Sequence, residues 1–183
     1  DPEEAQPAFV GTPYDVPLLF SEDASLFSAD GVLALLPEHF HRRGVGRLGV
    51  AVERRYGDFP DGLRDFDTEN ETVIAALVET YAHWAIALDV DGFRIDAVPH
   101  VDRPFWPRFA SGLRARLSAD GKERFLLLGE VFDVDSVIAD YTGDEGSIDA
   151  AFDIPFWADV VTDVVLGGAP PSQAEDSLSN ARA

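Results

Sequence analysis

Two strand-like segments with a helical segment between them constrain the fold of this chain most strongly. Residues 90–98 have the pattern of a β-strand, and residues 125–131 form a continuous apolar run typical of a strand covered on both faces. Residues 104–118 between them repeat large apolar side chains at helical spacing: Phe105, Phe109, Leu113 and Leu117. Strands that alternate with helices predict βαβ units and a parallel sheet.

The segment ahead of this pattern is irregular. Prolines and glycines interrupt residues 1–66 throughout, so we expect little regular structure there. A helix is predicted near 70–88, with Thr68 as its N-cap and Glu71 completing a capping box. We therefore predict two parts, an irregular segment over 1–66 and a strand–helix domain over 67–183.

The same alternation continues toward the end of the chain. A short helix is expected near 134–141, a strand near 150–155 and a helix from about 157. Paired glycines and prolines near 167–171 predict the end of that helix, and the polar tail beyond them is expected to be frayed.

Composition excludes several classes of partner. The chain has 34 acidic and 14 basic residues and a formal net charge of −20, which would repel nucleic acid and an anionic membrane surface. No apolar run is long enough to cross a bilayer. Cysteine is absent, which rules out disulfides and cysteine-based metal sites.

A charged pair interrupts the strand at 90–98. Strand alternation places Arg94, Asp96 and Val98 on one face, so an arginine and an aspartate are expected to point together toward the middle of the sheet. Burying such a pair costs several kcal/mol per ion, which makes stability a poor reason for it. The cation favours the ionised form that a nucleophilic carboxylate needs. A structural buried ion pair is the alternative.

A second carboxyl group ends the next strand. Glu130 follows the apolar run of 125–131, and Gly129 before it leaves room for a ligand. Catalytic groups of (β/α)₈ barrels lie at such strand ends. Two carboxyl groups at neighbouring strand ends, one ionised and one protonated, are the equipment of a glycosidase. Taken alone, Glu130 also fits an ordinary solvated carboxylate.

These residues lie in motifs that resemble a known family. The sequence DGFRIDAVPH at 91–100 resembles the nucleophile motif of the α-amylase family, glycoside hydrolase family 13. GEV at 129–131 is similar to its acid/base motif, and LRDFD at 63–67 to a short conserved stretch before the preceding helix. The segments YGDFP at 56–60 and FDIPF at 152–156 also read like α-amylase sequence, so the resemblance extends over about 56–160.

The resemblance implies a role for five residues. Asp96 would be the nucleophile and Glu130 the acid/base, while Arg94 would hold Asp96 in its ionised form. His100 would bind a sugar hydroxyl and turn its carbonyl toward the family's calcium ion. Asp65 matches a calcium-ligand position. A turn or cap role for Asp65 and a second-shell or surface position for His100 remain open.

The resemblance also implies that the chain is part of a larger barrel. Pro99 stands where the family often has lysine, which leaves contacts on the leaving-group side open. The family's first motif, with Asn-His, and its last, with His-Asp, are not found. The expected fold is therefore α/β, a partial (β/α)₈ barrel of about strands four to six. Residues 1–66 would belong to the loop domain that follows strand three.

The implied function is retaining hydrolysis of α-1,4-glucans such as starch by double displacement. An α-1,6-debranching enzyme, an α-glucosidase and a transglycosylase keep the same chemistry and remain alternatives. A non-catalytic carbohydrate-binding protein on a degenerate barrel is a third possibility. A flavodoxin-like module is disfavoured because no glycine-rich phosphate loop follows any strand. The sequence gives no localisation, and the resemblance is compatible with an extracellular protein.

Overall fold

The computed structural model describes residues 37–47, 49–59, 63–142 and 148–180. The chain forms two compact units. Among the described residues, unit one contains those up to Gly92 together with Pro99–Phe125, and unit two contains Phe93–Val98 and those from Leu126 onward. Each unit is considered by itself below.

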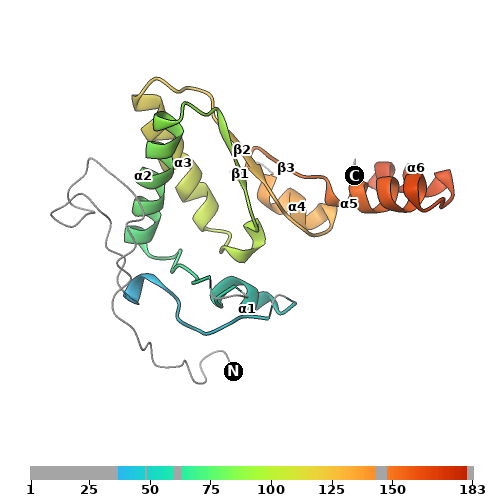
Figure 1. Ribbon diagram of the computed structural model, residues 1–183, viewed down its shortest axis with the longest axis horizontal. Coiled ribbons are helices and arrows are strands. Elements are labelled where there is room, and N and C mark those ends of the chain that lie inside the picture. Colours follow the sequence, from blue (N-terminus) through green and yellow to red (C-terminus); the bar gives the residue numbers. More distant parts are fainter. Residues whose placement is uncertain (1–36, 48, 60–62, 143–147, 181–183) are drawn as a thin grey trace. The chain divides into compact units, whose positions relative to one another are not determined.

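Two helices form the core of unit one. α2 (Glu71–Ala87) and α3 (Phe105–Ala119) lie side by side (Figure 1). Gly112 permits their close approach, because a Cβ atom at this position would lie 3.1 Å from Cγ2 of Val78. The predicted apolar stripe of α3 faces inward, since Phe105, Phe109, Leu113 and Leu117 are all buried.

The start of α2 differs from the prediction. Asn70 is the N-cap, and its side-chain oxygen accepts a hydrogen bond from the Thr72 backbone N–H at 2.9 Å. Thr68 instead lies two residues upstream, in a turn, where its backbone N–H donates to the carbonyl of Phe66. Both residues suit an N-cap, and the turn at 67–70 delays the helix until Asn70.

Regular structure ahead of α2 is short. The described part contains the 3₁₀-helix η2 (Pro37–His39) and α1 (Ala51–Tyr56). Isolated bridges pair Phe40 with Phe66 and Val45 with Asp58. The part of the predicted irregular segment over 1–36 lies outside the described residues, and its assignment to a loop domain stays a prediction.

A small sheet organises unit two. Its strands are β1 (Gly92–Ile95), β2 (Leu126–Gly129) and β3 (Ala150–Ala151), in the order β1-β2-β3 within the described chain. β2 and β3 are parallel, with Leu128 opposite Ala150. Glu130 donates its N–H to the carbonyl of Ile95 and accepts at its own carbonyl from the Val98 N–H, and these two bonds join the segments that follow β1 and β2. The parallel sheet is therefore confirmed on this scale, while closure into eight strands stays a prediction.

The strand β2 is covered on one face only. Leu127 is fully buried, whereas the Leu126 side chain is 48% exposed. The prediction of a strand covered on both faces is therefore wrong for this chain, because the described elements of unit two leave one side of β2 open.

The C-terminal part contains more helix than predicted. β3 has two residues, because the Asp153 side chain caps the short helix α5 (Ile154–Phe156) by accepting from the Phe156 N–H. The π-helix η5 (Trp157–Leu166) follows, and α6 (Pro171–Asn180) replaces the predicted frayed tail. Proline suits the first position of a helix, where its missing N–H would have no partner in any case. None of the helices described is long and apolar enough to cross a membrane.

Candidate active site

One arginine joins the two predicted catalytic carboxylates in unit two. Arg94 of β1 contacts Asp96 through Nη1, at 2.6 Å from Oδ1. Its other terminal nitrogen, Nη2, lies 2.9 Å from Oε1 of Glu130. The contact with Asp96 was expected from strand alternation, but the contact with Glu130 was not. The structure thus brings Arg94, Asp96 and Glu130 together.

The backbone fixes Glu130 beside the end of β1. The Glu130 N–H donates to the Ile95 carbonyl and the Glu130 carbonyl accepts from the Val98 N–H, and these two bonds place its Cα at the ends of the first two strands. Its Oε2 lies 3.5 Å from the Ala97 N–H, which is at the limit of hydrogen-bond distance. Glycine just before it permits close packing, because a Cβ atom at Gly129 would lie 3.0 Å from the Val98 side chain. The expectation that Gly129 makes room for a ligand is therefore not supported.

A left-handed residue follows Asp96. Ala97 has φ of +50°, a region that non-glycine residues seldom occupy. This conformation ends the strand alternation, so Val98 turns into the core and is fully buried instead of following Arg94 and Asp96. The predicted shared face therefore holds for the charged pair and fails for Val98. Strained backbone of this kind concentrates at functional sites.

The charged pair is more exposed than expected. The Asp96 side chain is 71% exposed and the Arg94 side chain 47%, while Glu130 is more enclosed at 30%. The prediction of a pair buried in the middle of the sheet is wrong for this chain. Asp96 lies beyond the last residue of β1, where no described element of unit two covers it.

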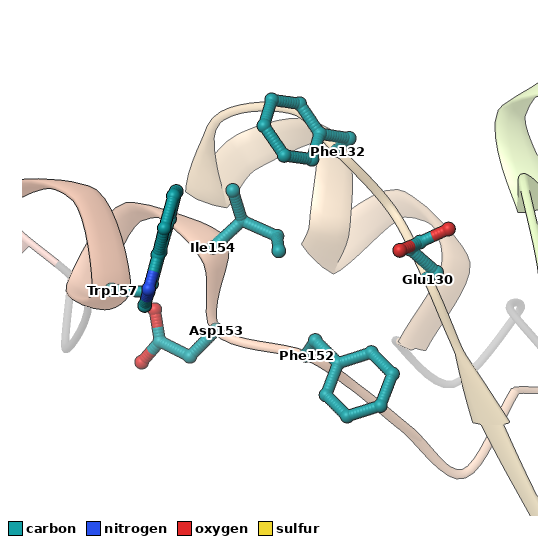
Figure 2. A pocket seen from close by; sticks show the side chains of 6 residues that line it. All are labelled: Glu130, Phe132, Phe152, Asp153, Ile154 and Trp157. Atoms are coloured by element: carbon teal, nitrogen blue, oxygen red, sulfur yellow. The ribbon is translucent and has the colours of Figure 1, made fainter.

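An aromatic hollow opens beside Glu130. Figure 2 shows the residues that line it, which come from the segment after β2, from the segment between β3 and α5, and from the first residues of α5 and η5: Glu130, Phe132, Phe152, Asp153, Ile154 and Trp157. Its volume of about 370 Å³ lies in the range of small-molecule pockets.

The other two predicted site residues belong to unit one. His100 ends the 3₁₀-helix η4 (Val98–His100), and its ring packs against Phe59 with 5.2 Å between the centroids. Asp65 contacts His41, with 2.5 Å between Oδ2 and the ring nitrogen Nδ1, and its backbone N–H donates to Asp58. Burial raises the pKa of Asp65 above its ordinary value, although the hydrogen bond from His41 opposes this.

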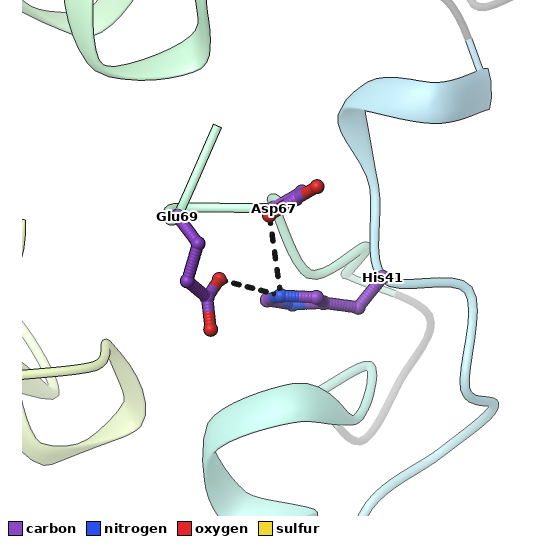
Figure 3. Close-up of side chains that lie close together, drawn as sticks. All are labelled: His41, Asp67 and Glu69. Carbon is purple, nitrogen blue, oxygen red and sulfur yellow. Dashed lines mark hydrogen bonds and ion pairs between the residues drawn. The ribbon is translucent and has the colours of Figure 1, made fainter. Parts of the chain in front are cut away.

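The sequence reasoning missed the cluster around His41. The second ring nitrogen, Nε2, lies 2.8 Å from Glu69 and 3.6 Å from Asp67 (Figure 3). Burial disfavours the protonated ring, but the hydrogen bonds and charges of Asp65 and Glu69 outweigh it and raise the pKa of His41. No local pattern reveals this cluster, because its partners lie 24 to 28 residues from His41.

The predicted calcium ligands do not form a calcium cage by themselves. Calcium takes about six to eight oxygen ligands. One carboxylate oxygen of Asp65 is already bound to His41, and His100 offers a single carbonyl oxygen. The calcium site stays a prediction, and no step below involves a calcium ion.

The fold and the site together define a class of protein. A parallel sheet with helices between its strands is consistent with part of an α/β barrel. Paired carboxyl groups at neighbouring strand ends are characteristic of glycoside hydrolases.

Comparison with known proteins identifies the family. The protein family described as "Alpha amylase, catalytic domain" matches residues 56–160 of this chain. The α-amylase of Streptomyces lividans is 38% identical over 121 residues, which cover 66% of this chain and 13% of that protein. The chain belongs to the α-amylase family of glycoside hydrolases.

Solved structures agree with this assignment. The Anoxybacillus α-amylase superimposes with a TM-score of 0.57 at 32% identity, covering 69% of this chain and 26% of that one. The α-amylase of Geobacillus thermoleovorans, solved in complex with acarbose, gives 0.55 at 31% identity and covers 64% and 25%. The chain therefore spans about a quarter or less of the length of these relatives.

Proposed function

We propose that this chain is the central part of the catalytic domain of a retaining glycoside hydrolase that acts on α-1,4-glucans. The observation that carries the proposal is the single guanidinium of Arg94 bound to both Asp96 and Glu130. Retaining enzymes hold two carboxyl groups about 5–5.5 Å apart across the scissile bond. A planar guanidinium with two donor nitrogens suits a pair of carboxylates at close range.

In the first step, a carboxylate oxygen of Asp96 attacks the anomeric carbon of a glucosyl unit. Glu130 gives its proton to the glycosidic oxygen as the bond between that oxygen and the anomeric carbon breaks. The leaving chain departs as an alcohol, and the glucosyl unit remains as an ester of Asp96.

In the second step, Glu130 acts as a base. It removes a proton from water while the water oxygen attacks the anomeric carbon. The ester bond breaks, Asp96 regains its negative charge and the configuration is retained. Arg94 would hold the Asp96 carboxylate in position for attack, and His100 would bind a sugar hydroxyl beside the cleavage point.

The aromatic hollow supports a sugar substrate. It adjoins Glu130, so a sugar ring bound against Phe132 or Trp157 would lie beside the residue that gives its proton to the glycosidic oxygen. The names of the relatives favour an α-1,4-glucan over the linkage alternatives. The hollow also suits a carbohydrate-binding protein, and the Arg94 bridge distinguishes an enzyme from it.

The test uses the intact protein of which this chain would be a part. Glu130→Gln should lower kcat on starch by at least about 100-fold. With maltosyl fluoride as the substrate, the rate of the glycosylation step should fall much less in this variant, because fluoride leaves without a proton. Asp96→Asn should lose activity on both substrates. Equal losses of glycosylation rate on both substrates for Glu130→Gln would refute the acid role, and an active Asp96→Asn would refute the nucleophile.

A further inference from the structure

His41 presents its two ring nitrogens to different carboxylates. Nδ1 lies 2.5 Å from Oδ2 of Asp65, while Nε2 faces Glu69 and Asp67. Without an ion both ring nitrogens can donate, Nδ1 to Asp65 and Nε2 to Glu69, and a metal ion would take the place of the Nε2 proton. Histidines that bind metals typically have this arrangement, with a carboxylate behind one nitrogen and the ion in front of the other.

The spacing of the ligand atoms fits a small divalent ion. One atom each from His41, Asp67 and Glu69 lie within 4.8 Å of one another. Bonds of about 2.0–2.2 Å in a tetrahedral site place ligand atoms about 3.4 Å apart. The separations from Nε2, 2.8 Å to Glu69 and 3.6 Å to Asp67, lie on either side of this value.

The backbone holds the ligands in place without an ion. His41 donates its N–H to the carbonyl of Asp65 at 3.1 Å, and Asp67 donates to the carbonyl of His39 at 3.0 Å. The rings of Phe40 and Phe66 stack between these bonds, with centroids 5.1 Å apart. Two segments far apart in the sequence are thus joined at the residues that carry the ligands. The loss of conformational entropy when an ion binds should therefore be small.

Burial and charge also suit a cation. The His41 side chain is only 9% exposed, whereas Glu69 is open to solvent and gives an ion a path of entry. Asp65, Asp67 and Glu69 surround one imidazole, which carries at most a single positive charge. A divalent ion would balance the remaining negative charge, and water would complete its coordination.

We propose that His41, Asp67 and Glu69 bind a first-row transition metal ion of the zinc type, with Asp65 as the residue that orients the histidine. Imidazole nitrogen suits zinc and its neighbours, whereas calcium prefers oxygen ligands throughout. The ion would clamp the segment before α1 to the turn that precedes α2. This site does not depend on the proposed hydrolase activity.

The experiment is a zinc titration of the tag-free 183-residue chain after treatment with a chelator. We expect about one equivalent of Zn²⁺ to bind by calorimetry, and Co²⁺ to give a visible absorption band that Zn²⁺ removes. His41→Gln should abolish binding, and Glu69→Gln should weaken it at least about tenfold. Asp65→Asn should weaken it by about 10–100-fold, as expected for an orienting partner.

His83→Gln is the matched control, because His83 lies on α2 outside the cluster, and zinc binding should be unchanged in it. Glu69→Gln provides a second test if His41→Gln does not fold. Glu69 is exposed, so its replacement should preserve the far-UV circular dichroism. The proposal is overturned if no saturable Zn²⁺ binding occurs, if His41→Gln binds as well as the original chain, or if Ca²⁺ displaces Zn²⁺ at equal concentration. The first outcome would leave His41 as a protonated ring paired with its carboxylates.

Discussion

Arg94 is the residue on which the candidate site depends most. Its side chain contacts Asp96 and Glu130 through separate nitrogens, so both carboxylates are positioned by one planar group. A lysine would keep the positive charge but offers a compact ammonium in place of the two-pronged guanidinium. Charge and geometry can therefore be separated by one substitution.

Arg94→Lys in the intact protein should lower kcat on soluble starch by at least about 100-fold, because small displacements of catalytic groups cost rates of this order. We expect a smaller change in KM, since ground-state contacts of the substrate are retained. The matched control is Arg47→Lys, an exposed arginine paired with Glu53 in the other unit, which should keep full activity. A variant Arg94→Lys with unchanged kcat would show that the bridge has no catalytic importance.

At the scale of elements, the structure shows which of two candidate N-cap residues starts α2. Thr68 and Asn70 are both good N-cap residues, and only Asn70 bonds the first turn. This turn follows the segment that carries Asp65, Asp67 and Glu69, so the cap also fixes where that segment ends.

Asn70→Ala should therefore destabilise the chain by about 1 kcal/mol, the usual cost of a lost N-cap. Asn70→Asp keeps an oxygen acceptor for the Thr72 N–H and should be close to neutral. Urea denaturation followed by circular dichroism measures both variants. If Asn70→Ala and Asn70→Asp had the same stability as the original chain, the cap assignment would be wrong.

The elements near the site could be predicted because their periodicity is local. Phe109 and Leu113 in α3 are buried as their spacing indicates, and β2 lies within the predicted apolar run. α6 was missed because its sequence is polar and its start at Pro171 was interpreted as a stop. A proline that starts a helix and one that ends a helix differ only in whether the helix lies after or before the proline in the sequence.

The candidate site was predictable only in part for a different reason. Each of Arg94, Asp96 and Glu130 interrupts or ends an apolar strand, which marks it in the sequence. The contact between Arg94 and Glu130 depends on the register of β1 against β2, and the cluster at His41 on a pairing across more than twenty residues. The spacing of residues in the sequence predicts neither the register of these strands nor the pairing at His41.

At the scale of the whole molecule, the described residues leave the candidate site largely open to solvent. In the described residues the sheet has three strands, so β1 and β3 are both edges. Asp96 is largely exposed to water, which weakens its electrostatic interactions through the high dielectric constant of the solvent. The S. lividans relative is several times longer than the matched region.

The 183-residue chain alone should therefore not hydrolyse starch at a measurable rate. Preorganised electrostatics in a water-excluded site is usually the largest catalytic term, and catalytic groups must be held within about 0.5 Å to supply it. The measurement is the release of reducing sugar from soluble starch by the purified chain, with Asp96→Asn as the control. We expect equal, background rates from both. Activity in the chain that disappears in Asp96→Asn would show that these three strands suffice for catalysis, and that the chain need not be part of a larger barrel to act.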